Sequence, residues 1–419
     1  MRLQGTISFV LFATLTQVTL AATVTHAEKK IDLSPPKLPL LQEFYHRVTL
    51  GGEINVIGFS ANHTPTTMGA APSNVGSPHA SDVDVSFATL FADAKLSDFA
   101  KAFIQASYSQ SSPSFLRSLP GGGDVFFLDK GYVTLANLSY TPFYIKAGRQ
   151  FLDFGGVDKS SYLESFTQLL SLTRATTFTA GFKNIHRFDG SLYAYQGLSS
   201  INDSSNSNRI RDYGLSFNYY QTEQPMSYQL GAGYLSNMAN ALYVSSTKAR
   251  SSNLGNNNAY NRAIPAIDLH GSVKVKAIDV RIKYIGALRR FNVNDIPYTR
   301  DGGSTFVGAK PAGWGMHVGY SFPLLAHDSH VSVGYQGSKE AVALGTASGS
   351  SSTSVSGTYG SFFSIGIPQR RYYVNYAVDF HRLLRVGAEL AEEGSYSATN
   401  GGTNRNGLIG LLMLTAKFV

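Results

Sequence analysis

Five charged residues of both signs lie in one stretch of the chain and are the first candidates for chemistry. They are Asp153, Asp158, Lys159, Glu164 and Arg174. Fixed charges act on ions by attraction and repulsion when they line a narrow passage. The same stretch carries large apolar side chains that would be costly to expose to water. We therefore predict that residues 152–174 form a loop packed inward, with these charges at a constriction. The alternative is a short external helix packed on neighbouring loops.

Signals for other chemistry are weak or absent. The sequence has no cysteine, which excludes disulfide frameworks, thiolate metal sites and cysteine nucleophiles. It contains no G-x-x-x-x-G-K, H-E-x-x-H or G-x-S-x-G motif, so phosphate-loop, zinc-protease and nucleophile-elbow chemistry is not indicated. His327 and His330 lie near one predicted turn, without a matching carboxylate pattern. We expect no catalytic residue, no metal and no cofactor, and we expect that the protein is not an enzyme.

The composition points to an ordered protein rather than to a nucleic-acid binder. Only 15% of the 419 residues are charged and 12% are aromatic, which argues against a disordered chain. The formal net charge of +8 is mild over this length and predicts no nucleic-acid partner.

Hydrophobic periodicity of two identifies the elements that position the charged loop. In the segment 312–322, Trp314, Met316 and Val318 alternate with small or polar residues such as Gly315 and His317. Alternation sustained over about ten residues is typical of barrel strands with lipid outside and water inside. Strands of soluble sandwiches are shorter, commonly about five or six residues.

Sixteen segments show this pattern. They are 48–59, 82–96, 100–109, 126–139, 142–151, 175–185, 187–197, 211–221, 225–236, 263–276, 278–288, 311–322, 329–338, 369–380, 383–392 and 406–418. The connections between them alternate short and long, as in bacterial outer-membrane barrels. We predict an all-β fold, a 16-stranded antiparallel transmembrane β-barrel with short periplasmic turns and long extracellular loops. Its surroundings are outer-membrane lipid.

The N-terminal residues have the pattern of an export signal. Arg2 precedes an apolar stretch from Ile7 to Leu20, and small residues follow. This predicts a signal peptide over 1–27, cleaved after residue 22 or 27. Residues 28–45 contain three prolines and are interpreted as a short periplasmic extension. The barrel then occupies 46–419.

The strand phase also predicts which charges face the lumen. The inward basic residues we single out are Lys101, Lys146, Arg281, Lys283, Arg371 and Arg385. The inward acids are Glu53, Asp82, Asp84, Asp268, Asp279, Asp379 and Glu389. The lumen is thus nearly balanced in charge, and anion preference does not follow from the net charge. Since sixteen strands enclose an aqueous channel, we predict a passage for small solutes.

Two short motifs resemble those of known barrels. The stretch GRQF-x-x-FG begins at Gly148, and FLDKGYVTLANL occupies 127–138. With the sixteen-strand plan, they resemble porin-like outer-membrane proteins and, more narrowly, siderophore porins of the legiobactin-uptake type. The resemblance covers most of Arg47 to Val419. The C-terminus departs from the pattern, because outer-membrane barrels often end in an aromatic residue and here Val419 follows Phe418.

The narrower resemblance implies ferric-siderophore entry through a barrel without a plug domain. A general diffusion porin without siderophore specificity is the alternative. A barrel-embedded hydrolase or an adhesin is the alternative from another class. The sequence leaves open whether the chain forms a homo-oligomer, because it does not separate outward residues that meet lipid from those that meet protein.

Overall fold

The structure, a computed structural model, describes most of the chain beyond its N-terminal segment. The described residues are 47–62, 79–109, 125–156, 160–201, 209–223, 225–245, 259–300, 305–344, 367–402 and 404–418. The chain divides into two units, Met1–Glu43 and Phe44–Val419, and every described residue belongs to the second. The predicted signal peptide and periplasmic extension therefore lie outside the described residues, as do Asp158 and Lys159.

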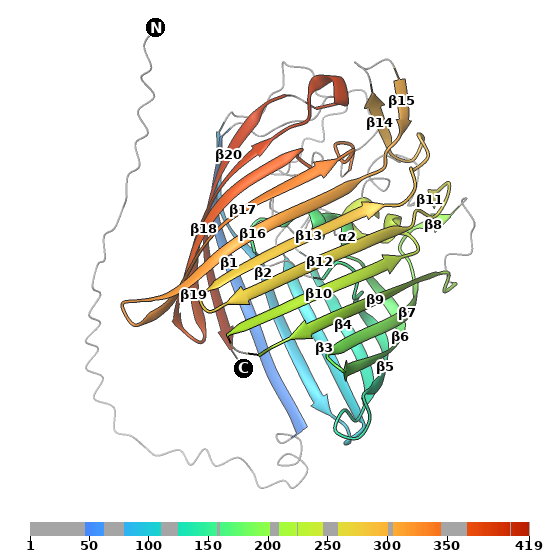
Figure 1. The fold of residues 1–419 in the computed structure, drawn as a ribbon, viewed down its shortest axis with the longest axis vertical. Coiled ribbons are helices and arrows are strands. Elements are labelled where there is room, and N and C mark those ends of the chain that lie inside the picture. The colour runs from blue at the N-terminus through green and yellow to red at the C-terminus, as the bar shows by residue number, and fades with distance from the viewer. Residues whose placement is uncertain are drawn as a thin grey trace. The chain divides into compact units, whose positions relative to one another are not determined.

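Sixteen antiparallel strands close into one barrel, in which each strand pairs with its neighbours and the last pairs with the first (Figure 1). The strands are β1 (Val48–Asn62), β2 (His79–Lys95), β3 (Ala100–Ser109), β4 (Val125–Ala136), β5 (Phe143–Phe151), β6 (Arg174–Ile185), β7 (Phe188–Gln196), β9 (Asp212–Gln221), β10 (Met226–Leu235), β12 (Ala266–Val275), β13 (Ile278–Ala287), β16 (Ala312–Leu324), β17 (His327–Lys339), β18 (Arg370–His381), β19 (Leu384–Gly394) and β20 (Asn406–Phe418).

Smaller elements lie in the connections. Two short strand pairs stand outside the barrel, β8 (Ser200–Ile201) with β11 (Ala259–Tyr260), and β14 (Pro297–Arg300) with β15 (Thr305–Gly308). Helical turns whose two ends are both described are α2 (Phe166–Ser171), η2 (Met238–Asn240) and η4 (Ala398–Asn400). No helix in the described part of the chain is long and apolar enough to cross a bilayer.

The sixteen predicted strands are confirmed, and their ends differ from the prediction by at most three residues. The segment predicted at 126–139 ends earlier, at Ala136. The reason is a turn, because the carbonyl of Asn137 accepts hydrogen bonds from the backbone N–H groups of Tyr140 and Thr141 at 3.0 and 2.8 Å. Connections of two to six residues alternate with connections of eleven to thirty residues, which agrees with the predicted alternation of short turns and long loops.

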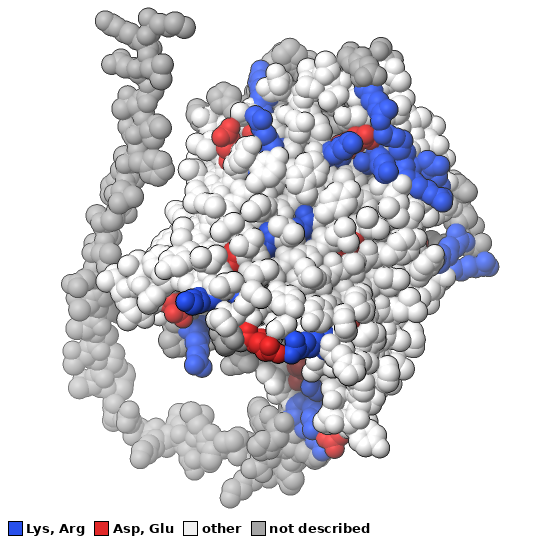
Figure 2. All heavy atoms as spheres, in the orientation of Figure 1, with Lys and Arg blue, Asp and Glu red and all other residues white. Residues whose placement is uncertain are grey.

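The pairing explains why a period of two is required. Along β20, Leu408, Leu412 and Leu414 are exposed, whereas Ile409 and Leu411 between them are buried in the interior. The outward positions form the apolar surface that a bilayer requires. Figure 2 shows the result on one face, where charged side chains gather mainly toward the two ends of the barrel and few lie between them.

Candidate functional site

The connection between β5 and β6 turns into the barrel, and we call residues 152–173 the lumen loop. At its base, the backbone N–H of Leu152 donates to the carbonyl of Thr173 at 2.9 Å. Within it, the Ser165 hydroxyl caps α2 by accepting from the backbone N–H of Gln168 at 3.2 Å. Serine is a favoured residue at such a helix start because its oxygen satisfies a free N–H group.

The lumen loop is bound to the opposite wall. The Glu389 carboxylate on β19 accepts hydrogen bonds from the Ser161 hydroxyl and the Tyr162 backbone N–H, both at 2.7 Å. On β18, the Asn375 side-chain amide donates to the Ser160 carbonyl at 2.7 Å. Around the ring, β6 is the sixth strand of sixteen and β18 the fourteenth, so these strands face each other. The loop therefore crosses the full width of the lumen.

A buried arginine fixes the next part of the loop. Arg371 on β18 donates from Nη1 to the Glu164 carbonyl at 2.8 Å and from Nε to the Glu393 carboxylate at 2.7 Å. Its guanidinium lies 4.7 Å from the centre of the Phe166 ring. The backbone N–H of Phe166 also donates to the Gln336 side chain at 3.1 Å. A planar guanidinium suits this combination of a carboxylate, a carbonyl and an aromatic face.

Apolar contacts add to these hydrogen bonds. Leu163 is 1% exposed and packs in a cluster with Ile57, Ile409 and Leu411 of the inner wall. Phe166 and Leu170 are fully buried. Burying one such side chain stabilises a fold by about 1.5–3 kcal/mol. The loop is thus held by both polar and apolar contacts.

The five charges expected at a constriction occupy different surroundings. Arg174 is 7% exposed and forms an ion pair with Asp129 at 2.8 Å, at the base of the loop. Asp153 accepts a hydrogen bond from the Ser191 hydroxyl at 3.1 Å. Burial raises the pKa of the Glu164 carboxyl to about 8, although nearby Arg371 opposes the shift. The structure does not describe the other two.

The six predicted lumen cations separate into two groups. Two of them hold the lumen loop: Arg371, as above, and Lys283, whose Nζ donates to the Gly156 carbonyl at 3.0 Å. The others belong to the wall. Arg385 is bidentate to Asp379 at 2.7 and 2.8 Å, Arg281 lies 3.2 Å from Asp279, Lys146 lies 5.0 Å from the Tyr132 ring centre, and Lys101 is exposed on β3.

A cavity of about 510 Å³ opens beside the lumen loop. Gly155, Gly156 and Ser160 of the loop line one side of it. The charged side chains that line it are Lys274, Asp279, Arg281 and Lys283. Three cations and one anion make this part of the lumen locally positive. The net charge of the whole chain does not predict where such a positive region lies.

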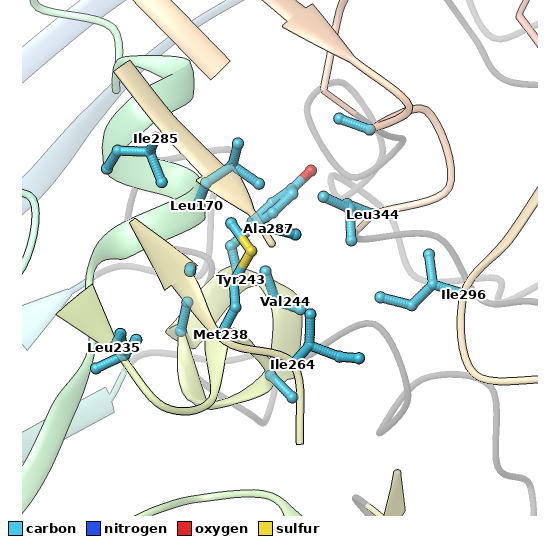
Figure 3. Close-up of a cluster of buried hydrophobic side chains, with 14 of the residues drawn as sticks. Leu170, Leu235, Met238, Tyr243, Val244, Ile264, Ile285, Ala287, Ile296 and Leu344 are labelled. Carbon is cyan, nitrogen blue, oxygen red and sulfur yellow. The ribbon is translucent and has the colours of Figure 1, made fainter. Parts of the chain in front are cut away.

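A second buried cluster was not anticipated. Apolar residues from the long connections and from the ends of β10 and β13 pack together with α2 (Figure 3). We call this cluster the loop core: Leu170, Leu235, Met238, Tyr243, Val244, Ile264, Ile285, Ala287, Ile296 and Leu344. Beside it, Arg290 donates to both carboxylate oxygens of Glu340 at 2.6 and 2.9 Å. The run from Met238 to Val244, which is apolar except for Asn240, was the signal available in the sequence.

Comparisons with known proteins agree with the fold. No family model matches the chain. A UPF0422 protein of Coxiella burnetii is 25% identical over 287 residues, which cover 67% of this chain and 54% of that protein. A UPF0422 protein of Legionella pneumophila strain Lens is 25% identical over 276 residues, 63% of this chain and 49% of that protein. The chain spans about half the length of the curated relatives it matches.

Solved structures cover nearly the whole barrel. Pseudomonas putida OprB superimposes with a TM-score of 0.54 at 12% identity, over 91% of this chain and 96% of that one. An anion-selective porin from Comamonas acidovorans gives a TM-score of 0.52 at 10% identity, over 88% and 99%. This chain is a closed β-barrel with the porin fold. The legiobactin-type resemblance is not addressed by these names and stays a prediction.

Proposed function

We propose that this barrel is a channel for small solutes across the outer membrane, narrowed by its lumen loop. The observation that carries the proposal is the attachment of Ser161 and Tyr162 to Glu389 on the far wall. A sixteen-stranded barrel is wide enough for water, and a loop that crosses it divides that width. Side chains at such a narrowing set selectivity.

We further propose that passage is selective. The loop core packs the long-loop side of the barrel with apolar side chains from several connections and from α2. The cavity on the other side of the lumen loop carries more cations than anions. A route bounded by packed loops and positive charge favours the passage of particular anionic solutes and opposes unselective diffusion.

The finer proposal for the solute is a ferric siderophore, and it rests on the resemblance of the Gly148 and 127–138 motifs to siderophore porins. A general diffusion porin remains the alternative. A homo-oligomer is compatible with either proposal. An enzyme or an adhesin would need no connected route through the lumen.

Planar lipid bilayers test the channel. Stable ion-conducting steps on insertion of the purified barrel are expected, with larger permeability for anions than for cations. Steps that open in groups of three would indicate a trimer. A barrel that inserts and stays electrically silent would contradict the channel proposal and favour a hydrolase or an adhesin.

Uptake of iron tests the solute. A strain lacking the gene is expected to take up a ferric siderophore more slowly, and the wild-type gene is expected to restore the rate. Uptake that is undiminished in the deletion strain, together with conducting steps in bilayers, would leave the general diffusion porin.

A further inference from the structure

Three side chains from three neighbouring strands converge on one point of the lumen wall. Asp279 on β13 pairs with Gly319 on β16 in the strand register, and His330 on β17 pairs with Ser321. The Nε2 atom of His317 lies 3.5 Å from one carboxylate oxygen of Asp279, and that of His330 lies 3.9 Å from the other. The three ligand atoms lie within 4.8 Å of one another.

These separations are longer than hydrogen bonds, which end at about 3.2 Å. They approach the spacing between ligands that share one ion. Metal bonds of about 2.0–2.2 Å to nitrogen and oxygen place neighbouring ligand atoms roughly 3–3.5 Å apart. Small side-chain movements are enough to bring the two imidazoles and the carboxylate to that distance.

The outer nitrogen of each imidazole is already oriented by a hydroxyl group. His317 Nδ1 lies 3.2 Å from the Tyr373 hydroxyl, and His330 Nδ1 lies 3.1 Å from the Ser321 hydroxyl. When Nδ1 carries the proton and donates it, the lone pair of Nε2 points at the cluster. Histidine ligands of metals are held in this tautomer by a hydrogen bond from the opposite nitrogen.

The glycine at position 319 leaves room for the His330 and Asp279 side chains to approach each other. A Cβ atom at Gly319 would lie 2.5 Å from His330 Cε1 and 2.6 Å from an Asp279 carboxylate oxygen. Any side chain there would therefore displace both groups. Asp279 and His317 also line the 510 Å³ cavity, which gives an ion a route in and gives water the remaining coordination positions.

We propose that Asp279, His317 and His330 form a binding site for a divalent first-row transition-metal ion in the lumen wall. Two imidazoles and one carboxylate with open positions suit zinc, iron, cobalt and nickel, whereas magnesium and calcium prefer oxygen ligands alone. The site departs from the expectation of no metal. It goes beyond the proposed channel, because metal binding and conduction are measured separately.

The test uses the untagged full chain in detergent micelles, since a histidine tag would bind the same ions. One equivalent of Co²⁺ is expected to give a visible absorption band that Zn²⁺ abolishes, and calorimetry with Zn²⁺ is expected to give one site per chain. His317→Ala, His330→Ala and Asp279→Asn are each expected to weaken Zn²⁺ binding by about a hundredfold or more. Mutation of a residue that only supports a metal ligand lowers metal affinity by about tenfold to a hundredfold, and loss of a ligand is expected to lower it at least as much.

Matched variants separate the site from general effects. His327→Ala changes a histidine of the same hairpin outside the cluster and is expected to leave binding unchanged. Gly319→Ala, which keeps all three ligands, is expected to weaken it because its methyl group displaces His330 and Asp279. Tyr373→Phe is expected to weaken it about tenfold. Heat-modified electrophoretic mobility checks that each barrel is folded. Equal Zn²⁺ binding by the wild type and folded His317→Ala or His330→Ala barrels would overturn the proposal.

Discussion

Glu389 accepts two hydrogen bonds of 2.7 Å from consecutive residues of the lumen loop, and the first donor, the hydroxyl of Ser161, is 228 residues away in sequence. A carboxylate on the inner wall of β19 thereby holds a segment that starts on the opposite wall. The pair Glu389–Ser161 is therefore one of the contacts that hold the lumen loop against the far wall.

Glu389→Gln is expected to release this part of the loop. The amide keeps the size of the side chain, but its NH₂ end cannot accept from Ser161 or from the Tyr162 N–H. Each hydrogen bond to a charged group contributes roughly 1.5–3 kcal/mol. Single-channel conductance in bilayers is expected to rise, with more frequent fluctuations.

The control for Glu389→Gln lies on the same strand. Glu392 is exposed and accepts only from the Asn406 side chain at 3.1 Å among the hydrogen bonds described for it. Glu392→Gln is expected to conduct like the wild type. Equal conductance of all three proteins would mean that the loop is held without Glu389.

The two arginine–carboxylate pairs of β18 and β19 are expected to differ in their effect on stability. Arg371 and Glu393 have side chains that are 6% and 5% exposed, whereas those of Arg385 and Asp379 are 47% and 37% exposed. Removing one partner of a buried pair costs about 3–5 kcal/mol, since the other charge stays buried. An exposed pair contributes about 0–1 kcal/mol.

Urea unfolding in micelles measures this difference through the single tryptophan, Trp314. Arg371→Ala is expected to lower the free energy of unfolding by about 3 kcal/mol or more, and Arg385→Ala by about 1 kcal/mol or less. Losses of similar size would show that Arg371 is not an anchor of the loop.

The strands could be predicted from the sequence because each one meets lipid on one side and the lumen on the other. This alternation fixes which residues of β20 face outward, such as Leu412, without knowledge of any partner strand. The phase also placed Glu389 and Arg371 among the inward residues, since it depends only on position along one strand.

What these inward residues contact could not be predicted. Asp279, His317 and His330 come from three strands, and no spacing along the chain relates them. The binding of Ser161 to Glu389 depends on how far a loop reaches across the lumen. Contacts of this kind follow from barrel closure and register, which a single sequence does not encode as a periodic signal.

Glu164 is expected to make the channel sensitive to pH. Burial raises its pKa to about 8, above the ordinary value of 4.5. An acid whose pKa is higher in the folded state binds more protons there, so the stability of the docked loop falls as pH rises from about 4.5 to 8. Conductance is expected to increase between pH 7 and 9, as ionised Glu164 leaves its half-buried position.

Glu164→Gln removes the titrating group and is expected to give a flat conductance profile over this range, because the amide resembles the protonated acid. A wild-type profile that is itself flat, or a variant that keeps the full response, would assign the pH dependence elsewhere.

Two adjacent glycines of the lumen loop are expected to respond differently to a methyl group. Gly155 and Gly156 both have a positive φ, 74° and 52°, so alanine costs about 1–2 kcal/mol of backbone strain at either position. At Gly155 the new Cβ would also lie 2.4 Å from the Ser171 side chain and 2.8 Å from Ile285 Cδ1. At Gly156, no atom of the described residues apart from the chain neighbours lies within 4 Å of the new Cβ.

Gly155→Ala is therefore expected to displace α2 and to change conductance and stability more than Gly156→Ala. Unfolding free energies and single-channel recordings of the two variants give the comparison. Identical behaviour would show that the loop moves freely enough to absorb the added methyl group.

Arg281 is expected to oppose metal binding at the proposed site. Its Nη2 lies 3.2 Å from an Asp279 carboxylate oxygen, and its side chain is 46% exposed. The guanidinium neutralises a carboxylate that an incoming cation would use. Exposed ion pairs contribute about 0.2–1 kcal/mol, so Arg281→Gln is expected to tighten Zn²⁺ binding by up to about fivefold. Lys283 is a cation on the same strand, but it contacts the Gly156 carbonyl. Lys283→Gln is therefore expected to change Zn²⁺ binding less than Arg281→Gln does. Weaker Zn²⁺ binding by Arg281→Gln would mean that Arg281 positions Asp279 rather than competing for it.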